Sequence, residues 1–173
     1  LSCIRFGNVM ISRGSVIPLF EQQIKNKKMI TITDPEMTRF MMSINDTVNL
    51  VFKATIKAKG GDIFILKMPV VKIKDLADVL IKKYAKKYGY ETKKIKKEII
   101  GARPGEKIYE ELRTDTEAEK ALETKEMLII PRFDPTYKKN NKIIYEGAKK
   151  SKLKNYISND EKMLSRKQIK KLL

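Results

Sequence analysis

Hydrophobic and polar positions along the chain predict short strands that alternate with amphipathic helices. Residues 30–33 alternate branched apolar and hydroxyl side chains, which is the two-residue period of a half-buried strand. Apolar residues recur at helical spacing in three longer segments, each with a serine suited to cap its start or a glycine suited to end it: residues 15–24, 43–61 and 72–89.

The remaining periodic segments are shorter. Strands are expected at residues 1–6, 62–66, 93–100 and 128–130, the third of them an edge strand protected by its lysines. A helical turn is expected at residues 108–112 and a capped terminal helix at residues 165–173. Interleaved strands and helices indicate an α/β fold, with too few strands to complete a doubly wound sheet.

The first candidate for ligand chemistry is Arg39. The strand at residues 30–33 ends at Asp34–Pro35, because proline cannot donate to a ladder and aspartate closes turns. Arg39 then stands within a second apolar run, so its guanidinium is expected to point into a cleft, where it would suit phosphate or carboxylate. On these residues alone, a structural ion pair with Asp34 or Glu36 is an equal alternative.

The second candidate is the segment Arg103–Glu106. Its central proline and glycine predict a rigid turn that presents the arginine and the glutamate to one ligand. An arginine for a phosphate and a carboxylate for a ribose diol would form a nucleotide site. The alternative is an ion pair between Arg103 and Glu106 that braces the turn.

Charge and size restrict the possible partners. The 173 residues are 42% hydrophobic, enough for a core of one domain or part of one. Lys and Arg number 38 against 21 Asp and Glu, a net charge of +17. This excess is compatible with nucleic acid or anionic surfaces as partners, and equally with a lysine-rich proteome such as that of a heat-adapted organism.

Residue types that are rare or missing exclude several classes of protein. Cys3 is the single cysteine, which excludes an internal disulfide and fits a reducing, cytoplasmic compartment. No histidine is present, so Ser-His-Asp and Cys-His catalysis and the usual zinc sites are excluded. No apolar run reaches the roughly 20 residues of a membrane span. No signal peptide is expected, because polar and charged residues interrupt the apolar residues after Leu1, and the chain is expected to be a fragment cut at a structural boundary.

Seven motifs occur in one order and together closely resemble a known family. They match the C-terminal half of the nucleotide-sugar 4,6-dehydratases of the extended short-chain dehydrogenase/reductase family, and most nearly the UDP-N-acetylglucosamine 4,6-dehydratase group of polysaccharide biosynthesis. The motifs are Arg5–Val9, Ser12–Phe20, Ile30–Asp34, Met37–Phe40, Gly60–Phe64, Lys72–Ala77 and Arg103–Lys107.

The resemblance implies a domain organisation. Residues 1–133 would be the substrate-binding half of the enzyme, with part of a Rossmann sheet and a small substrate-binding domain, and the N-terminal cofactor domain would be absent. Composition adds a tail: lysine and asparagine dominate from Pro131 onward and apolar spacing weakens, so residues 134–173 are expected to be a lysine-rich, poorly packed tail with a terminal helix. The tail matches the family more loosely, at residues 156–160 and 164–165.

The resemblance also implies roles for individual residues. Substrate-binding residues would be Asn8 and Val9 near the sugar or diphosphate, Ser15 and Thr31 in the wall around uracil, Arg39 and Arg103 on the diphosphate, and Glu106 on the ribose. Phe6 and Gly7 would lie near the nicotinamide of NADP. No metal is implied.

Two motifs of such enzymes are missing, the glycine-rich turn for the cofactor and the Tyr-x-x-x-Lys pair. No catalytic residue is therefore expected in this chain, which should be inactive alone. In the parent enzyme, the implied reaction oxidises the sugar at C4 with NADP, eliminates water across C5 and C6 and returns the hydride to C6.

Three other interpretations stay open. The related outcome is C4 epimerisation of a UDP-sugar, which upstream groups would decide. A basic nucleic-acid-binding module would use the tail from Lys138 to Lys171, although aromatic residues are sparse there and a solvated lysine-rich surface is the better explanation. If the piece is structural, the strands at residues 1–6 and 63–66 are expected to expose edges and apolar faces, which predicts self-association into a homo-oligomer.

Overall fold

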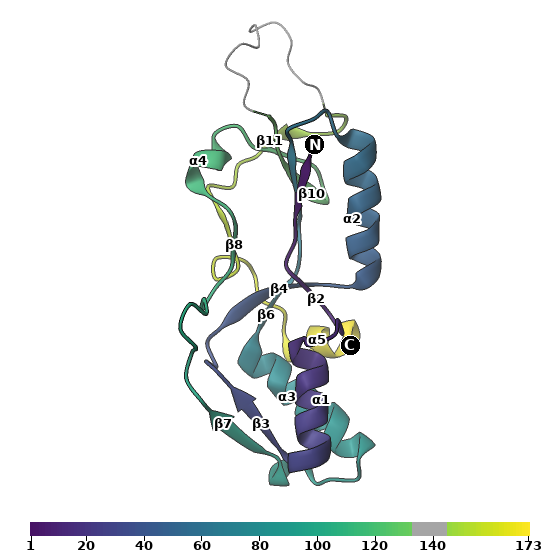
Figure 1. The fold of residues 1–173 in the computed structure, drawn as a ribbon, viewed down its shortest axis with the longest axis vertical. Helices are drawn as coiled ribbons and strands as arrows, with labels where there is room; N and C mark the ends of the chain where they lie inside the picture. Colours follow the sequence, from purple (N-terminus) through teal and green to yellow (C-terminus); the bar gives the residue numbers. More distant parts are fainter. Residues whose placement is uncertain (133–144) are drawn as a thin grey trace, which may run out of the picture.

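The computed structural model describes residues 1–132 and 145–173 and has a mixed α/β architecture, as expected. The molecule is elongated (Figure 1). A sheet with helix α2 beside it forms one end, helices α1, α3 and α5 with strands β3 and β7 form the other, and a small sheet joins them.

The sheet at the first end has the order β1-β5-β10-β9-β11. Strand β1 runs parallel to β5 and the other neighbours are antiparallel. The strands are β1 (Cys3–Arg5), β5 (Ile63–Leu66), β10 (Met127–Ile130), β9 (Leu122–Glu123) and β11 (Lys149–Lys150). Helix α2 (Ile44–Lys57) begins at a capping box between Ser43 and Asp46 and packs Leu50 and Ala54 against Phe64 and Ile129.

The middle of the molecule contains two small sheets. In one, β4 (Thr38–Met42) lies between β2 (Asn8–Val9), which is parallel to it, and β6 (Val70–Lys72), which is antiparallel. In the other, β8 (Glu111–Arg113) pairs with β12 (Tyr156–Ile157). Phe40 of β4 stacks on Tyr156 with ring centroids 4.5 Å apart, which joins the two sheets.

The second end is a helical layer over a parallel pair of strands. Helices α1 (Val16–Lys27), α3 (Ile73–Lys87) and α5 (Arg166–Leu172) pack their apolar sides together and against β3 (Met29–Ile32). Strand β7 (Lys96–Ile99) pairs with β3 and is exposed throughout, so it is the lysine-rich edge strand that the sequence predicts. Short helices are η1 (Thr92–Lys94) and α4 (Asp115–Ala118).

Three expectations are corrected. Residues 108–112 are not helical, because the carbonyl of Ile108 accepts the N–H of Thr38 on β4 and residues 111–112 belong to β8. Helix α2 ends at Lys57, before Gly60. The described part of the tail is well packed rather than loose, since the exposed fractions of Tyr145, Tyr156 and Ile169 are 3%, 2% and 1%.

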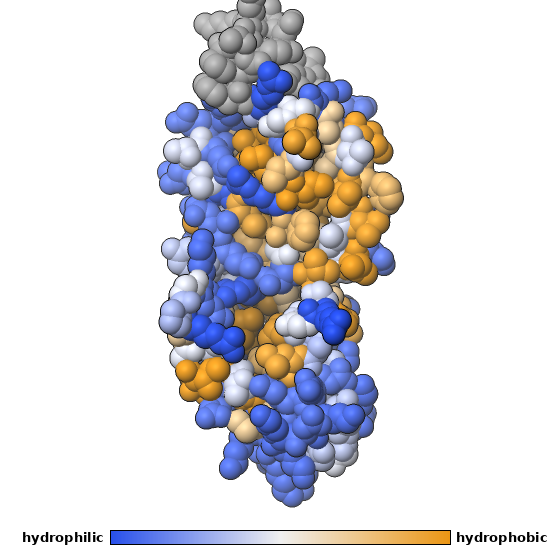
Figure 2. All heavy atoms as spheres, in the orientation of Figure 1, coloured by the Kyte–Doolittle hydropathy of each residue, from blue (hydrophilic) through white to orange (hydrophobic). Residues whose placement is uncertain are grey.

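Helix α2 leaves most of its apolar residues in solvent. Its stripe of exposed side chains consists of Ile44, Val48, Val51, Phe52 and Ile56, which are 41–81% exposed. On the face shown in Figure 2, hydrophobic residues gather over this end of the molecule, whereas the opposite end is mostly hydrophilic. The division of the chain near residue 133 stays a prediction, and residues 134–144, which include Tyr137 and part of the basic tail, lie outside the described residues.

Candidate functional site

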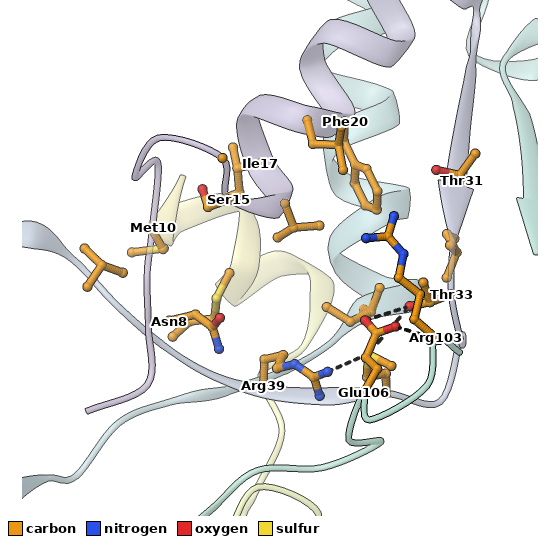
Figure 3. Close-up of a pocket in the computed structure, with 18 of the residues that line it drawn as sticks. Asn8, Met10, Ser15, Ile17, Phe20, Thr31, Thr33, Arg39, Arg103 and Glu106 are labelled. Carbon is orange, nitrogen blue, oxygen red and sulfur yellow. Dashed lines mark hydrogen bonds between the residues drawn. The ribbon is translucent and has the colours of Figure 1, made fainter. Parts of the chain in front are cut away.

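A cavity of about 290 Å³ lies between α1, β3, β4 and the loop that follows β7. Figure 3 shows the side chains that line it. The structure brings together at this cavity every residue that the sequence assigns to substrate: Asn8, Val9, Ser15, Thr31, Arg39, Arg103 and Glu106.

The loop segment Arg103–Glu106 forms the turn that its sequence predicts. Gly105 has φ +81°, and the N–H of Glu106 donates to the carbonyl of Arg103 at 2.9 Å, as in a type II turn with proline in second place. The Glu106 carboxylate accepts the main-chain N–H of Arg103 at 3.1 Å and the hydroxyl of Thr33 at 3.4 Å. Glu106 therefore fixes the loop through main-chain and hydroxyl groups, rather than through an ion pair with the Arg103 side chain.

The guanidinium of Arg103 is exposed, and the described residues provide it with no hydrogen bond or ion pair. In Figure 3 it extends along the cavity toward Phe20 and Thr31. Because guanidinium is a strong donor to phosphate and carboxylate oxygens, this side chain is available to an anionic ligand.

Arg39 also lines the cavity, but the two terminal nitrogens of its guanidinium are already hydrogen-bonded. They bond to the carbonyls of Thr38 at 2.7 Å, Lys107 at 2.7 Å and Ile108 at 3.2 Å. The alternative of an ion pair with Asp34 or Glu36 is wrong, because Asp34 accepts the N–H of Glu36, and Glu36 pairs with Lys72. Arg39 thus attaches the loop after Glu106 to strand β4.

Asn8 is held at the cavity by Glu110, a residue that the sequence analysis missed. Its amide donates to Glu110 Oε1 at 2.8 Å and to the carbonyl of Phe40 at 3.4 Å. Glu110 also accepts the N–H of Phe40 at 3.0 Å and lies 3.9 Å from Nε of Arg39. The expected helix at residues 108–112 concealed this role, since only the extended backbone brings Glu110 beside β4.

Ser15 stands at the N-cap position of α1, as its sequence position predicts, yet its hydroxyl makes no cap bond. The oxygen is buried and has no partner among the described residues. Buried hydroxyls are nearly always hydrogen-bonded, so an unpaired one at a cavity indicates a place for a ligand or water.

Thr31 is fixed by Gln23 of α1, which the sequence analysis also missed. The side chain of Gln23 bonds to both the hydroxyl and the main-chain N–H of Thr31. A glutamine on the polar side of an amphipathic helix carries no recognisable signal, and only the packing of α1 beside β3 reveals the contact.

Phe6 and Gly7, the residues expected near the cofactor, do not line this cavity. The Phe6 side chain is 41% exposed. A Cβ atom at Gly7 would lie 2.5 Å from Cβ of Phe40 and 2.6 Å from its carbonyl oxygen, so glycine is required here by the crossing of the chain over β4.

The described residues offer neither a metal-binding cluster nor a membrane-spanning helix. They contain no cluster of three or more histidine, cysteine or acidic residues that could hold a metal ion. None of their helices combines the length and apolar character of a membrane-spanning segment.

Comparison with known proteins identifies the family. The family model described as "Polysaccharide biosynthesis protein" matches residues 1–132. The chain belongs to this family. A solved structure, Pen from Bacillus thuringiensis, is 46% identical and superposes with a TM-score of 0.86 over 99% of this chain and 48% of its own.

Two curated relatives are similar to almost the whole of this chain. An uncharacterized membrane protein of Methanocaldococcus jannaschii is 49% identical over 99% of this chain and 48% of its own length. A protein of Rickettsia typhi named UDP-glucose 4-epimerase is 42% identical over the whole of this chain and 49% of its own length. The chain thus spans about half the length of the relatives it matches.

Proposed function

We propose that the chain forms the UDP-sugar-binding part of an enzyme that modifies nucleotide sugars for polysaccharide biosynthesis. The observation that carries the proposal is the Arg103 guanidinium, which has no described partner in a cavity that also contains the Glu106 carboxylate and the unpaired Ser15 hydroxyl. The family match and the relatives named UDP-glucose 4-epimerase support the same class of ligand.

Each group has a chemical role in this proposal. Arg103 binds the diphosphate, because guanidinium donates to two phosphate oxygens at once. Glu106 accepts from the ribose hydroxyls, since its carboxylate has lone pairs beyond those used by Thr33 and the loop. Thr31 and the segment that begins at Ser15 surround the base, and Asn8 with Val9 lies toward the sugar.

Arg39 has a different role from the one that the resemblance implies. Its guanidinium donates to three carbonyls, so a direct diphosphate contact would have to break existing bonds. We assign Arg39 to holding the loop that carries Glu106. In this proposal, Arg103 is the main residue that binds the negatively charged diphosphate.

The size of the cavity fits a part of the ligand. Its volume of about 290 Å³ is at the lower end of ligand pockets, which run from about 300 to 1,000 Å³. A UDP-sugar needs more space than this. We therefore expect this chain to contribute one wall of the complete site, to bind UDP weakly and to be inactive alone.

NADP is the cofactor of the proposed enzyme, and bound NADP would accept a hydride from the sugar and return it. The exposed ring of Phe6 is suited to contact a flat cofactor ring, whereas Gly7 is explained by its packing against Phe40. The sequence contains no Gly-x-Gly-x-x-Gly turn. Most cofactor contacts are therefore expected from residues beyond this chain.

The reaction outcome has two candidates. The motif resemblance favours a 4,6-dehydratase acting on UDP-N-acetylglucosamine, and the names of the Rickettsia relatives favour a C4 epimerase. Product analysis of a protein of the relatives' length that contains this chain distinguishes them. A 4-keto-6-deoxy product supports dehydration, and a C4-inverted sugar supports epimerisation.

The binding proposal is tested by NMR titration of the isotope-labelled chain with UDP and UDP-N-acetylglucosamine. We expect shifts at Thr31, Arg103 and Glu106, and a loss of affinity of about tenfold in Arg103→Ala, the value of one charged hydrogen-bond pair. Lys107→Ala is the matched control, because it removes a neighbouring exposed cation outside the cavity lining.

Two results would contradict the proposal. One is an absence of UDP-induced shifts around the cavity, and the other is equal affinity in the wild type and Arg103→Ala. Tight, salt-sensitive binding of DNA or RNA by the same chain would favour the nucleic-acid alternative instead.

A further inference from the structure

Gln23 and Thr31 are joined by two hydrogen bonds behind the cavity wall. Nε2 of Gln23 donates to the Thr31 hydroxyl at 2.8 Å, and Oε1 of Gln23 accepts the main-chain N–H of Thr31 at 3.1 Å. Thr31 lines the cavity, whereas Gln23 does not. One amide therefore fixes both the backbone and the side chain of a cavity residue without facing the cavity itself.

The backbone of β3 explains why this position needs a partner. The carbonyls of Lys28 and Ile32 accept N–H groups of Lys96 and Ile100 along the edge that pairs with β7. Main-chain groups alternate between the two edges of a strand, so those of Thr31 belong to the opposite edge. Among the described residues, no strand pairs with that edge. The side chain of Gln23 instead accepts the main-chain N–H of Thr31, as a neighbouring strand would.

The same alternation leaves two main-chain groups for a ligand. The carbonyl of Thr31 and the N–H of Thr33 follow on this edge, and the described residues give neither a hydrogen bond. Both residues line the cavity. A carbonyl and an N–H side by side complement a planar base that presents one donor next to one acceptor.

We propose that Gln23 is a positioning residue for the nucleobase. By occupying the N–H and the hydroxyl of Thr31, it fixes the orientation of the β3 edge, so that the Thr31 carbonyl and the Thr33 N–H meet the base without reorganisation. The inference rests on the proposed nucleotide site and adds to it a residue outside the cavity lining.

A purely structural role for Gln23 is the alternative, because the same bonds join α1 to β3. The two roles differ in which ligands they affect. Loss of a base-positioning residue weakens binding of UDP but leaves binding of pyrophosphate, which has no base, unchanged. Loss of a structural residue weakens both to the same degree.

The experiment is an NMR titration of the 173-residue chain with UDP and, separately, with pyrophosphate. In Gln23→Ala, we expect the dissociation constant of UDP to rise about tenfold, the value of about one lost hydrogen bond, and that of pyrophosphate to change less than about twofold. Gln23→Glu has the same length and two acceptors for the N–H and hydroxyl of Thr31, so it should restore most of the UDP affinity. Gln22→Ala, at the exposed neighbouring position, is the matched control.

Arg103→Ala, titrated in parallel, distinguishes failure of the nucleotide site from failure of the role proposed for Gln23. If Arg103→Ala weakens both ligands while Gln23→Ala changes neither, the role of Gln23 is overturned and the nucleotide site stands. If Gln23→Ala weakens UDP and pyrophosphate equally, Gln23 is structural and the inference is also overturned. If the wild type binds neither ligand, the nucleotide site and the role of Gln23 are overturned together.

Discussion

The Arg39 guanidinium donates to the main-chain carbonyl of Lys107 at 2.7 Å, across the gap between strand β4 and the loop that follows β7. The adjacent carbonyl of Ile108 accepts from the same side chain at 3.2 Å. The guanidinium of Arg103, on the other side of Glu106, has no partner among the described residues. Two arginines at one cavity therefore have separate roles, one in the structure of the loop and one open to ligand.

Substitution of the two arginines should separate stability from binding. Arg39→Ala should lower the free energy of unfolding by about 2 kcal/mol, because charged hydrogen bonds to partly buried carbonyls are lost. Arg103→Ala should change it by less than about 0.5 kcal/mol, as is usual for an exposed side chain without partners. Urea unfolding followed by circular dichroism measures both. Equal destabilisation by the two changes would contradict the assignment.

Gly7→Ala should destabilise the protein by about 1–3 kcal/mol, the usual range for overpacking a filled interior. The new Cβ would meet Cβ and the carbonyl oxygen of Phe40, neither of which can rotate away. Gly89→Ala is a suitable comparison, because its Cβ meets no atom within 4 Å and only its φ of +70° is unfavourable. Thermal unfolding should rank Gly7→Ala as the more damaging. The reverse order would show that the backbone of β4 at Phe40 can shift to make room for the new Cβ atom.

The pair between Arg5 and Glu117 predicts a loss of stability in acid. Both carboxylate oxygens of Glu117 lie 2.8 Å from nitrogens of Arg5, and these bonds hold the pKa of Glu117 below its usual value of 4.5. A lowered folded-state pKa stabilises the protein above the unfolded value, and this stabilisation disappears as the pH falls through the folded value.

Glu117→Gln tests this pH dependence. Its unfolding free energy should lie about 1 kcal/mol below that of the wild type at neutral pH, and the difference should shrink as the pH is lowered below 4.5. Glu119→Gln, two residues away and exposed, is the control. A difference that stays constant from neutral to acid pH would mean that the pair contributes nothing through ionisation.

Arg113 should be the residue on which the C-terminal segment most depends. It is fully buried, which lowers the pKa of its guanidinium, and it donates to the Ser151 hydroxyl and to the carbonyls of Leu153 and Asn155. Arg113→Ala leaves these acceptors unpaired and should cost about 3 kcal/mol or more. Lys154→Ala, on the exposed side of the same segment, should be nearly neutral. Limited proteolysis after residue 145 measures the local effect, and resistance equal to the wild type would contradict it.

The exposed stripe of α2 predicts self-association of this chain. Contiguous apolar surface of this kind is uncommon on monomeric proteins, and a second copy can cover it. Phe52 and Ile56 are 64% and 81% exposed, so Phe52→Lys and Ile56→Lys should leave the fold intact. Sedimentation should detect oligomers of the wild type and a shift to monomer in the double variant. An unchanged proportion of oligomers in the double variant would mean that the copies associate through a surface other than α2.

Periodic segments were predictable from sequence because their local pattern and their packing agree. Helix α3 buries the inward side that its spacing indicates, and the capping box of Ser43 starts α2. The helix at residues 108–112 was predicted wrongly, because the apolar spacing suits a helix while the carbonyl of Ile108 accepts from both Thr38 and Arg39 of β4. The tail was misjudged for a related reason: Tyr145 and Tyr156 are isolated in sequence but bond to Asp62 and Met68, which lie far upstream.

The candidate site was predictable as far as side-chain chemistry reaches. Side-chain chemistry in turns and strands pointed to Arg39, Arg103 and Glu106, and the family resemblance added the other residues that line the cavity. Their partners were not predictable, since the acceptors of Arg39 are main-chain carbonyls, which every residue possesses. The same limit concealed Gln23 and Glu110, whose importance depends on which elements become neighbours.

Helix α5 is synthesised long after the helices that it packs against. Ile169 is part of the same core as α1, β3 and α3, and Arg166 pairs with Asp75 and Asp78 of α3. These partners lie more than 80 residues upstream, and the carbonyl of Val70 receives the N–H of Leu164. The ribosome therefore releases α1 and α3 long before the helix that closes over them. A nascent chain arrested before residue 164 would expose that apolar surface to chaperones.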